Sequence, residues 1–341
     1  MPEIRRVLLT GATGFVGRHL YPVLLDGGFA VVSGSRDPDA AQRRFRGRAF
    51  VKLDVNDYHT VRNAMEGCQA AVYLVHSMAE GAGYEHAEAR GAIAFARAAE
   101  QAGLSRIVYL GGIQPFGMAS RHLRSRLRTG ELLRNSGVPT LELQAAMIIG
   151  AGSESWRIVR DLAARLPFMV LPRWLESRSQ PVYIDDVTAV LRRALTLEIP
   201  GSIAYALPGP EILSAREILT RTAHLLGLAP PMVQVPVFTP ALSSFWISIV
   251  TRANQQISRQ LVEGLRSDLI APDDGIWQLI PDHPRVPFDE AARRALIAEA
   301  RTLPLRTRFA EWLLHRITPG LAALPAHEKP LDKQSPTGAT L

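Results

Sequence analysis

Six short apolar runs alternate with longer amphipathic stretches in the first 150 residues. Near-continuous apolar runs of this length are typical of parallel strands that are buried on both faces. We predict strands at residues 5–11, 29–35, 48–55, 70–77, 105–112 and 138–150, and helices at 15–28, 56–67, 84–103 and 120–137. Strands that alternate with helices in this way indicate the α/β class with a doubly wound parallel sheet.

The alternation becomes less regular after residue 150. Residues 156–168 are expected to form a helix, and residues 181–195 a strand and a helix that return to the main sheet. Ser214 and Glu217 have the spacing of a capping box that opens a further helix. We therefore divide the chain into a core at 1–150, a smaller substrate-binding portion at 151–317 that is interleaved with the core, and a tail at 318–341 that we expect to be disordered.

The composition is that of a globular protein, with 47% apolar residues among 341 and a formal net charge of +7. We expect most of the arginine side chains to lie on the solvated surface and some of them to be available to bind a phosphate group of a cofactor. No zinc-finger spacing, helix-turn-helix or RNP motif occurs, so no nucleic-acid partner is expected. No metal site is expected either, because the adjacent Asp185 and Asp186 are interpreted as caps of a helix N-terminus.

Cys68 is the one cysteine of the chain, so an internal disulfide is excluded, and its apolar neighbours indicate that it is buried beside a strand. The most apolar late stretch, at 238–250, is too short to span a bilayer. We expect a cytoplasmic protein without a transmembrane segment. Contact with a membrane surface stays open, and the sequence does not determine the oligomeric state.

The stretch TGATGFVG, at residues 10–17, lies between the first predicted strand and the first predicted helix. Gly11 allows a tight turn, Gly14 lets a pyrophosphate approach the backbone, and Gly17 lets the helix pack close to the sheet. The helix N-terminus then offers free N–H groups and the positive end of its dipole to phosphates. The position of this motif after a strand and before a helix predicts a dinucleotide site. We assign to it Gly11, Thr13, Gly14, Phe15, Val16 and Gly17.

The second predicted strand ends in Ser35 and is followed by Arg36. An NAD site usually has an acidic residue there that binds the ribose 2′-hydroxyl, whereas an arginine suits a 2′-phosphate. Asp37 and Asp39 follow closely in the sequence, and an acidic residue at this point makes the distinction between an NADP site and an NAD site less clear. We predict NADP(H) as the preferred cofactor, with NAD(H) as the alternative; a solvated Arg36 without a ligand is the competing interpretation.

These segments together resemble the short-chain dehydrogenase/reductase superfamily: TGATGFVG, Arg36, LDVND around Asp54, YLVHS and RIVYLGG. The resemblance spans about residues 4 to 300 and is closer to the atypical NAD(P)-binding branch, which includes NmrA-like regulators, YbjT-like proteins and an accessory subunit of respiratory complex I. It implies a Rossmann fold. It also implies further cofactor contacts, which are Asp54 and Val55 beside the adenine, Val75, His76 and Ser77 toward the nicotinamide, and Gly111 after the fifth strand.

The resemblance also places His122 and Arg126 where typical members carry the catalytic Tyr-x-x-x-Lys, and Gly111 and Gly112 where they carry a serine. All three usual residues are therefore absent. A histidine can exchange a proton near neutral pH, and a fixed arginine cation can orient the cofactor. We consider His122, Arg126 and His76 as candidate catalytic residues. The alternative is that His122 and Arg126 form the solvated side of a basic helix.

Two classes of function follow from these residues. The first is an NADPH-dependent reductase of a small apolar carbonyl or enone compound, whose pocket would include Trp174, Phe245, Trp246 and Trp277 unless these belong to the core. The second is a non-catalytic NADP(H) sensor or an accessory subunit, which the missing Ser, Tyr and Lys favour. An epimerase or dehydratase of the nucleotide-sugar type is a third option.

Overall fold

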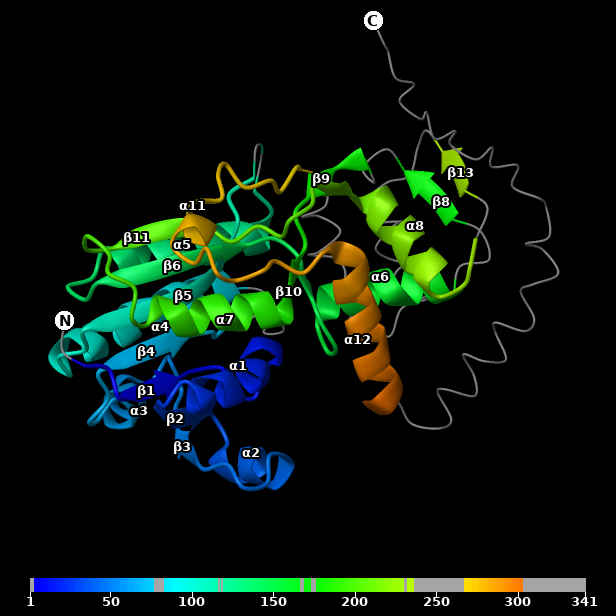
Figure 1. Ribbon diagram of the computed structural model, residues 1–341. Coiled ribbons are helices and arrows are strands. Elements are labelled where there is room, and N and C mark those ends of the chain that lie inside the picture. Colours follow the sequence, from blue (N-terminus) through cyan, green and yellow to red (C-terminus); the bar gives the residue numbers. More distant parts are fainter. Residues whose placement is uncertain are drawn as a thin grey trace, which may run out of the picture.

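The computed structural model describes residues 3–76, 83–115, 117, 119–165, 169–172, 176–229, 232–235 and 267–302. Its largest sheet is built from β1 (Arg6–Leu9), β2 (Ala30–Ser35), β3 (Phe50–Lys52), β4 (Ala70–Tyr73), β5 (Arg106–Gly112), β6 (Thr140–Ala145) and β11 (Ile203–Ala206). These seven strands are all parallel, in the order β11-β6-β5-β4-β1-β2-β3 (Figure 1). The predicted doubly wound α/β sheet of the Rossmann type is confirmed.

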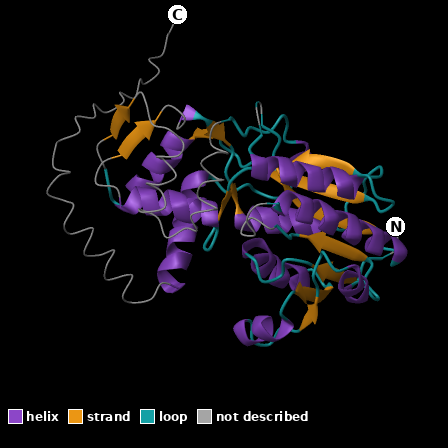
Figure 2. Ribbon diagram, turned by 180° about the vertical axis from the view of Figure 1, so that it is seen from behind, coloured by secondary structure: helices purple, strands orange, loops and turns teal. Residues whose placement is uncertain are grey.

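Helices cover both faces of this sheet (Figure 2). One face packs against α1 (Phe15–Asp26) and α7 (Ile184–Ala194), and the other against α3 (Tyr58–Ala64), α4 (Tyr84–Gln101) and α5 (Arg121–Arg134). The alternation of strand side chains explains this burial, because Val7 and Leu9 of β1 join the first core and Leu8 joins the second. A short helix, α2 (Pro38–Arg44), lies between β2 and β3 at one edge.

The sequence pattern was less accurate beyond β5. The predicted strand at 138–150 is divided into β6 and β7 (Ile148–Ile149). The strand expected at residue 181 is β10 (Val182–Tyr183), which pairs with β7 in a separate sheet instead of returning to the main one. Only its helix, α7, returns to the main sheet. The seventh strand, β11, was not predicted because its apolar run is only four residues long.

The second half of the chain packs three helices around one apolar cluster. These helices are α6 (Glu154–Arg165), α8 (Ala215–Leu225) and α12 (Phe288–Thr302), and the cluster includes Trp156, Ile218 and Ala292. Two short strand pairs complete this portion: β8 (Met169–Pro172) with β13 (Met232–Val235), and β9 (Arg178–Ser179) with β12 (Leu213–Ser214). The short helix α11 (Gly275–Gln278) packs instead against β11 of the main sheet.

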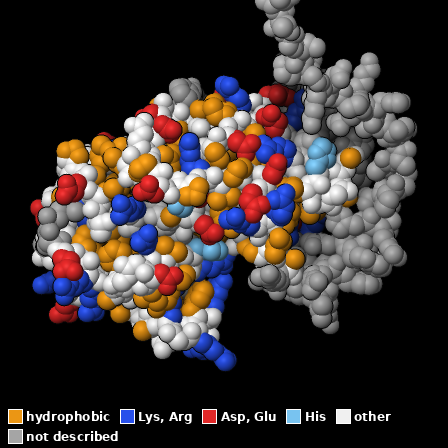
Figure 3. Space-filling view, in the orientation of Figure 1, with side chains coloured by type: hydrophobic (Ala, Val, Ile, Leu, Met, Phe, Trp, Pro, Cys, Tyr) orange, Lys and Arg blue, Asp and Glu red, His pale blue; other side chains and the backbone are white. Residues whose placement is uncertain are grey.

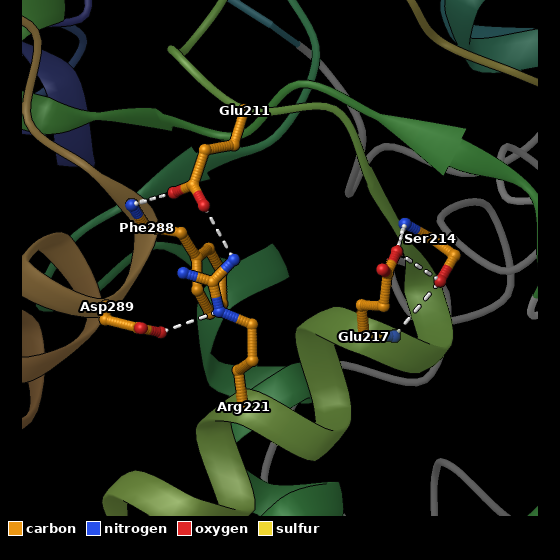
Figure 4. Close-up of polar contacts among 6 residues, drawn as sticks. All are labelled: Glu211, Ser214, Glu217, Arg221, Phe288 and Asp289. Atoms are coloured by element: carbon orange, nitrogen blue, oxygen red, sulfur yellow. Dashed lines mark hydrogen bonds and ion pairs between the residues drawn. The ribbon is translucent and has the colours of Figure 1, made fainter. Parts of the chain in front are cut away.

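Hydrogen bonds and ion pairs connect α8 to α12 and to the loop that contains Glu211 (Figure 4). The Ser214 hydroxyl accepts a hydrogen bond from the Glu217 N–H at 3.1 Å, and the Glu217 carboxylate accepts one from the Ser214 N–H at 2.7 Å, which confirms the predicted capping box. Arg221 donates to Asp289 of α12 at 2.8 Å and to Glu211 at 2.7 Å. The same Glu211 accepts from the Phe288 N–H at 2.7 Å, so one arginine links α8 to the start of α12.

The interpretation of Asp185 and Asp186 as helix caps is wrong. Both lie inside the first turn of α7, after an N-cap at Tyr183. The buried Asp186 carboxylate instead accepts from His283 at 2.8 Å and from the Val286 N–H at 3.0 Å, so it secures the segment that leads to α12. No group of three or more potential metal ligands lies among the described residues.

The remaining predictions concern single residues and the membrane. Cys68 is buried, as expected, and Trp277 belongs to the core beside the main sheet, where its indole donates to the Pro208 carbonyl at 2.9 Å. The other three aromatic candidates, Trp174, Phe245 and Trp246, and the tail at 318–341 lie outside the described residues. In the described part of the chain, no helix is both long and apolar enough to cross a bilayer.

Candidate functional site

A groove of about 460 Å³ runs along the carboxyl ends of β1 to β4. Ligands of open α/β sheets bind at this end of the strands. The groove is lined by Gly11, Thr13, Gly14, Gly34, Ser35, Arg36, Asp37, Ala40, Ala41, Arg44, Leu53, Asp54, Val55, Asn56, Leu74, Val75 and His76. Nine of the residues predicted to bind the cofactor are therefore brought together in one place.

The turn between β1 and α1 lines the groove next to the end of β4. The buried Thr10 hydroxyl joins this turn to β4, since it donates to the Val72 carbonyl at 3.1 Å and accepts from the Leu74 N–H at 2.9 Å. Gly11 then adopts a φ of +58°, which favours glycine. A Cβ on Gly17 would lie 2.3 Å from the Gly11 carbonyl oxygen, so only glycine allows the helix to start this close to the turn.

The N-terminus of α1 is open to a ligand. Its N-cap is Gly14, and no side chain of the described residues caps it. A Cβ on Gly14 would meet only the Gly11 carbonyl oxygen, at 3.1 Å. The exposed N–H groups and the helix dipole therefore face the groove without competition from a protein carboxylate, which is the arrangement that binds a pyrophosphate.

One end of the groove contains Ser35, Arg36, Asp37 and Arg44. The Asp37 carboxylate is engaged as the N-cap of α2 and accepts from the Ala40 N–H at 2.9 Å. Arg44 forms no ion pair with a carboxylate of the described chain and stacks over Phe45. This end of the groove therefore has two arginines and an acid that is already hydrogen-bonded to the backbone, which favours an anionic ligand.

Positive charge continues from this end toward the second half of the chain. Arg18 of α1 donates to the Ala151 carbonyl at 2.7 Å, and burial, Arg44 and Arg157 together lower its pKa. Figure 3 shows Lys and Arg side chains along the notch between the portion that carries α2 and the portion that carries α12. The notch is suited to attract a ligand with several phosphates.

His76, His122 and Arg126 meet beside the end of β5. Arg126 donates through Nη2 to the Leu110 carbonyl at 3.1 Å, and His76 has a backbone hydrogen bond to Leu110. His122 lies one helical turn before Arg126 and is only 8% exposed. The alternative that His122 and Arg126 form a solvated helix face is therefore wrong. Their helix, α5, starts at the N-cap Ser120, whose hydroxyl accepts from the Leu123 N–H at 3.3 Å.

Residues 11–160, which include the glycine turn, match the sequence model of the NAD(P)H-binding family. This segment has the Rossmann fold and is similar in sequence to NAD(P)H-binding proteins. The Rossmann fold that the resemblance to short-chain dehydrogenases/reductases implies is confirmed, since solved structures with this fold include two reductases in complex with NADP(H) or NADPH and a nucleoside-diphosphate-sugar epimerase. Membership of the NmrA-like and YbjT-like branch stays a prediction.

Three sequence relatives are similar over most of this chain. An uncharacterised protein of Mycobacterium tuberculosis is 30% identical over 240 residues, which are 70% of this chain but only 24% of that protein. The chain therefore spans about a quarter of the length of this mycobacterial relative. A ceramide reductase of Caulobacter vibrioides is 25% identical over 71% of this chain and 78% of its own length. A (4-alkanoyl-5-oxo-2,5-dihydrofuran-3-yl)methyl phosphate reductase of Streptomyces griseus is 28% identical over 65% and 74%.

Solved structures with the same fold include an Escherichia coli NADPH-dependent quinone oxidoreductase in complex with NADPH. It has a TM-score of 0.67 and 17% identity, and the match covers 84% of this chain and 98% of that one. A Citrobacter triphenylmethane reductase in complex with NADP(H) has a TM-score of 0.65 and 16% identity, with 85% and 99% covered. At these identities the likeness concerns the fold.

Burial of His122 and His76 affects the pKa of both imidazoles. Burial, with Arg126 as the second cause, lowers the pKa of His122 to about 3. Burial, Arg126 and His122 also hold the pKa of His76 well below its ordinary value. Both imidazoles are therefore neutral at physiological pH. A buried cation beside an arginine is costly, so the structure favours the neutral form of His122, and a role of His122 in proton exchange stays a prediction.

Four predicted cofactor residues, Phe15, Val16, Gly17 and Gly111, do not line the groove, and Ser77 lies outside the described residues. Phe15 and Val16 pack instead against the apolar cluster of the second half. Several residues that line the groove were not predicted to bind the cofactor. Among them, Arg44 is important because it adds a positive charge beside Arg36. The sequence does contain a signal for Arg44, because it is a basic residue at the end of the short helix that follows Arg36. This seven-residue helix was not predicted, so the signal was not used.

Proposed function

We propose that the protein is an NADPH-dependent reductase of a small, fairly apolar carbonyl or enone compound. The observation that carries the cofactor preference is the groove end where Arg36 and Arg44 accompany Ser35 while Asp37 caps α2. An acid that selects NAD must be free to accept from the ribose 2′-hydroxyl. Oδ1 of Asp37 accepts the Ala40 N–H, which directs this carboxylate toward α2, and two guanidinium groups beside it favour a 2′-phosphate.

The residues of the groove fit the rest of a dinucleotide equally well. Gly14 and the uncapped start of α1 would hold the pyrophosphate, and the carbon side chains of Leu53 and Val55 offer an apolar edge to the adenine. The Asp54 carboxylate accepts from the Asn56 N–H at 3.0 Å and so holds this edge in place. His76 lies at the far end of the groove, where the nicotinamide would reach.

The substrate class draws support from the two named relatives. One is named for ceramide, which is a lipid, and the other for a dihydrofuranone that carries an alkanoyl group. The second name combines an alkanoyl chain with a ring carbonyl group. We propose an alkyl-bearing carbonyl or enone for this protein as well.

A bound reduced nicotinamide would supply a hydride, and the protein would position the acceptor. His76, His122 and Arg126 lie together at the end of β5, next to the groove. Arg126 offers a fixed positive charge to an oxygen that becomes negative as the hydride arrives, which is electrostatic stabilisation of the transition state.

The test is hydride transfer itself. The protein is incubated with NADPH that carries deuterium at both positions of C4 of the nicotinamide, together with 4-nitrobenzaldehyde, 2-decanone or 2-cyclohexenone. We expect mass spectrometry to find one deuterium in the product of at least one acceptor, and to find it faster with NADPH than with NADH. Tight NADPH binding without label transfer to any acceptor contradicts the reductase.

A second candidate is a non-catalytic NADP(H) sensor or accessory subunit. The observation that favours it is that His122 and Arg126 stand where the usual tyrosine and lysine are absent, while burial lowers the pKa of His122 and of the nearby His76. Such a protein would respond to the cofactor by a change in its contacts with a partner. Nucleotide binding with an unchanged absorbance of NADPH at 340 nm in every acceptor assay would support this candidate.

A further inference from the structure

The end of β5 brings two unusual groups together. Nδ1 of His122 is buried and has no hydrogen-bond partner among the described residues, and the same holds for Nε of Arg126. Buried polar atoms of native proteins are nearly always hydrogen-bonded, so an orphaned pair on one helix face marks a place where another molecule supplies the partner. His122 is 8% exposed, so open solvent does not satisfy its nitrogen.

This pair lies next to the groove. Arg126 donates to the Leu110 carbonyl at 3.1 Å, and His76, which lines the groove, is hydrogen-bonded to the backbone of the same Leu110. Tyr109 donates its hydroxyl to the Arg126 carbonyl at 3.0 Å, which holds this turn of α5 against β5. The guanidinium is therefore fixed beside the groove wall at the nicotinamide end.

The charged and titratable neighbours do not supply a proton. On α4, the Glu88 carboxylate accepts from Ser125, and Glu85 forms an ion pair with Arg121 at 3.0 Å. On β6, Glu142 is paired with Arg134. Burial raises the pKa of Tyr109 to about 12 and that of Tyr73 further still. Arg126 makes a charge less favourable on both His122 and His76.

We propose, on the basis of the proposed reductase function, that Arg126 and His122 hold the substrate oxygen as a cation and a neutral N–H donor, and that water supplies the proton that completes the reduction. The carbonyl carbon gains the hydride and its two electrons, and the electron pair of the C=O bond moves to the oxygen. That oxygen then takes a proton from water, which leaves hydroxide in the solvent. The products are an alcohol and the oxidised cofactor.

The roles of the two residues differ in this scheme. Arg126 compensates the negative charge on the oxygen. A lysine in its place would lack the planar guanidinium group, and a glutamine would lack the positive charge. His122 needs to offer only an N–H group, because a neutral imidazole does not give up its second proton near neutral pH. An asparagine can replace such a donor, whereas a leucine cannot.

The first test reads the protonation of the histidines without turnover. The protein is labelled with ¹⁵N-histidine, and its imidazole nitrogens are followed by NMR from pH 4 to 8, with assignments from His122→Asn and His76→Asn. We expect His122 to remain a neutral tautomer from pH 5 to 8. A His122 signal that titrates between pH 6 and 7 overturns the proposal, even if the protein is a reductase.

The second test follows kcat/KM for 4-nitrobenzaldehyde or 9,10-phenanthrenequinone with NADPH from pH 5.5 to 8.5. We expect a wild-type profile that varies less than twofold, a three- to tenfold loss in His122→Asn, and a loss of at least a hundredfold in His122→Leu and Arg126→Gln. Arg128→Gln, on the exposed side of the same helix, serves as the control and keeps the wild-type rate.

Two outcomes of the second test contradict the scheme in different ways. A wild-type rate that falls tenfold per pH unit above pH 6 to 7, and becomes flat in His122→Asn, shows that the histidine is the acid. No turnover by the wild type with any acceptor removes the proposed reductase function and this proposal with it. The NMR titration separates the two cases, because it does not depend on a substrate.

Discussion

At the scale of single residues, His122 illustrates what a sequence can indicate and what it cannot. The four-residue spacing from Arg126 places both on one face of a helix, and the structure confirms that they lie together on α5. Whether that face meets solvent or the sheet depends on how α5 packs. The burial of His122, and therefore its charge, could not be derived from the local sequence.

The low pKa of His122 predicts a pH dependence of stability. The unfolded chain takes up a proton near pH 6.5, but the folded chain does so only near 3, so the unfolded state binds more protons between these values. Stability therefore falls as the pH falls through this range, by about 2 kcal/mol between pH 7.5 and pH 5 for this one group. Urea unfolding of His122→Asn is expected to lose that part of the slope.

The control for this experiment is the exposed His59, and His59→Asn is expected to keep the wild-type slope. An unchanged pH dependence of the free energy of unfolding in His122→Asn would contradict the assigned protonation of His122.

At the scale of elements, the glycine turn was the most predictable part of the site. Its strand, its turn and its helix are all local, and the strain at Gly11 and the close approach at Gly17 depend on neighbouring backbone. The end of the groove at Arg36 was less predictable, because the role of Asp37 depends on α2. An aspartate that could select NAD becomes a helix cap once that helix forms.

Gly14 and Gly17 are expected to respond differently to alanine. In Gly17→Ala the new Cβ would lie 2.3 Å from a carbonyl oxygen of the turn, so we expect a loss of stability of about 2 kcal/mol or more. In Gly14→Ala the fold is expected to survive, since the one close atom is 3.1 Å away, while nucleotide affinity falls at least tenfold because the methyl group lies in the pyrophosphate path.

Thermal unfolding and NADPH titration of both variants measure these effects. Equal loss of folding stability in the two variants, or full nucleotide affinity in Gly14→Ala, would argue against this division of roles.

The capping box of α8 gives a prediction on stability alone. Ser214→Ala removes the acceptor of the Glu217 N–H and is expected to lower the free energy of unfolding by about 1 kcal/mol without a change in nucleotide affinity. Thr196→Ala, at an exposed threonine, serves as the control and should change stability by less than about 0.5 kcal/mol. Chemical denaturation of both variants checks the difference, and equal values would count against the cap.

At the scale of the whole molecule, the order of strands and helices up to β6 followed from hydrophobic pattern. Buried parallel strands have runs of apolar residues that need no long-range information. The second half did not follow in this way. Its strands are two to four residues long, and contacts distant in sequence hold its helices, such as Arg221 with Asp289 and Asp186 with His283. The local pattern of apolar and polar residues does not reveal which residues distant in the sequence will pair.

A fluorescence titration of NADPH and NADH into the wild type, Arg36→Ala and Arg44→Ala measures whether this end of the groove selects a 2′-phosphate. Arg43→Ala is the matched control, because Arg43 lies on the same helix as Arg44 but does not line the groove. We predict that the wild type binds NADPH more tightly than NADH. Each groove variant is expected to lose about 1–3 kcal/mol of that preference, as for a charge-assisted hydrogen bond, while the control keeps it.

A wild type that binds NADH as tightly as NADPH, with no effect of either groove variant, would contradict the assignment of this end of the groove to a 2′-phosphate. Absence of binding of both nucleotides at micromolar concentration would contradict the account as a whole.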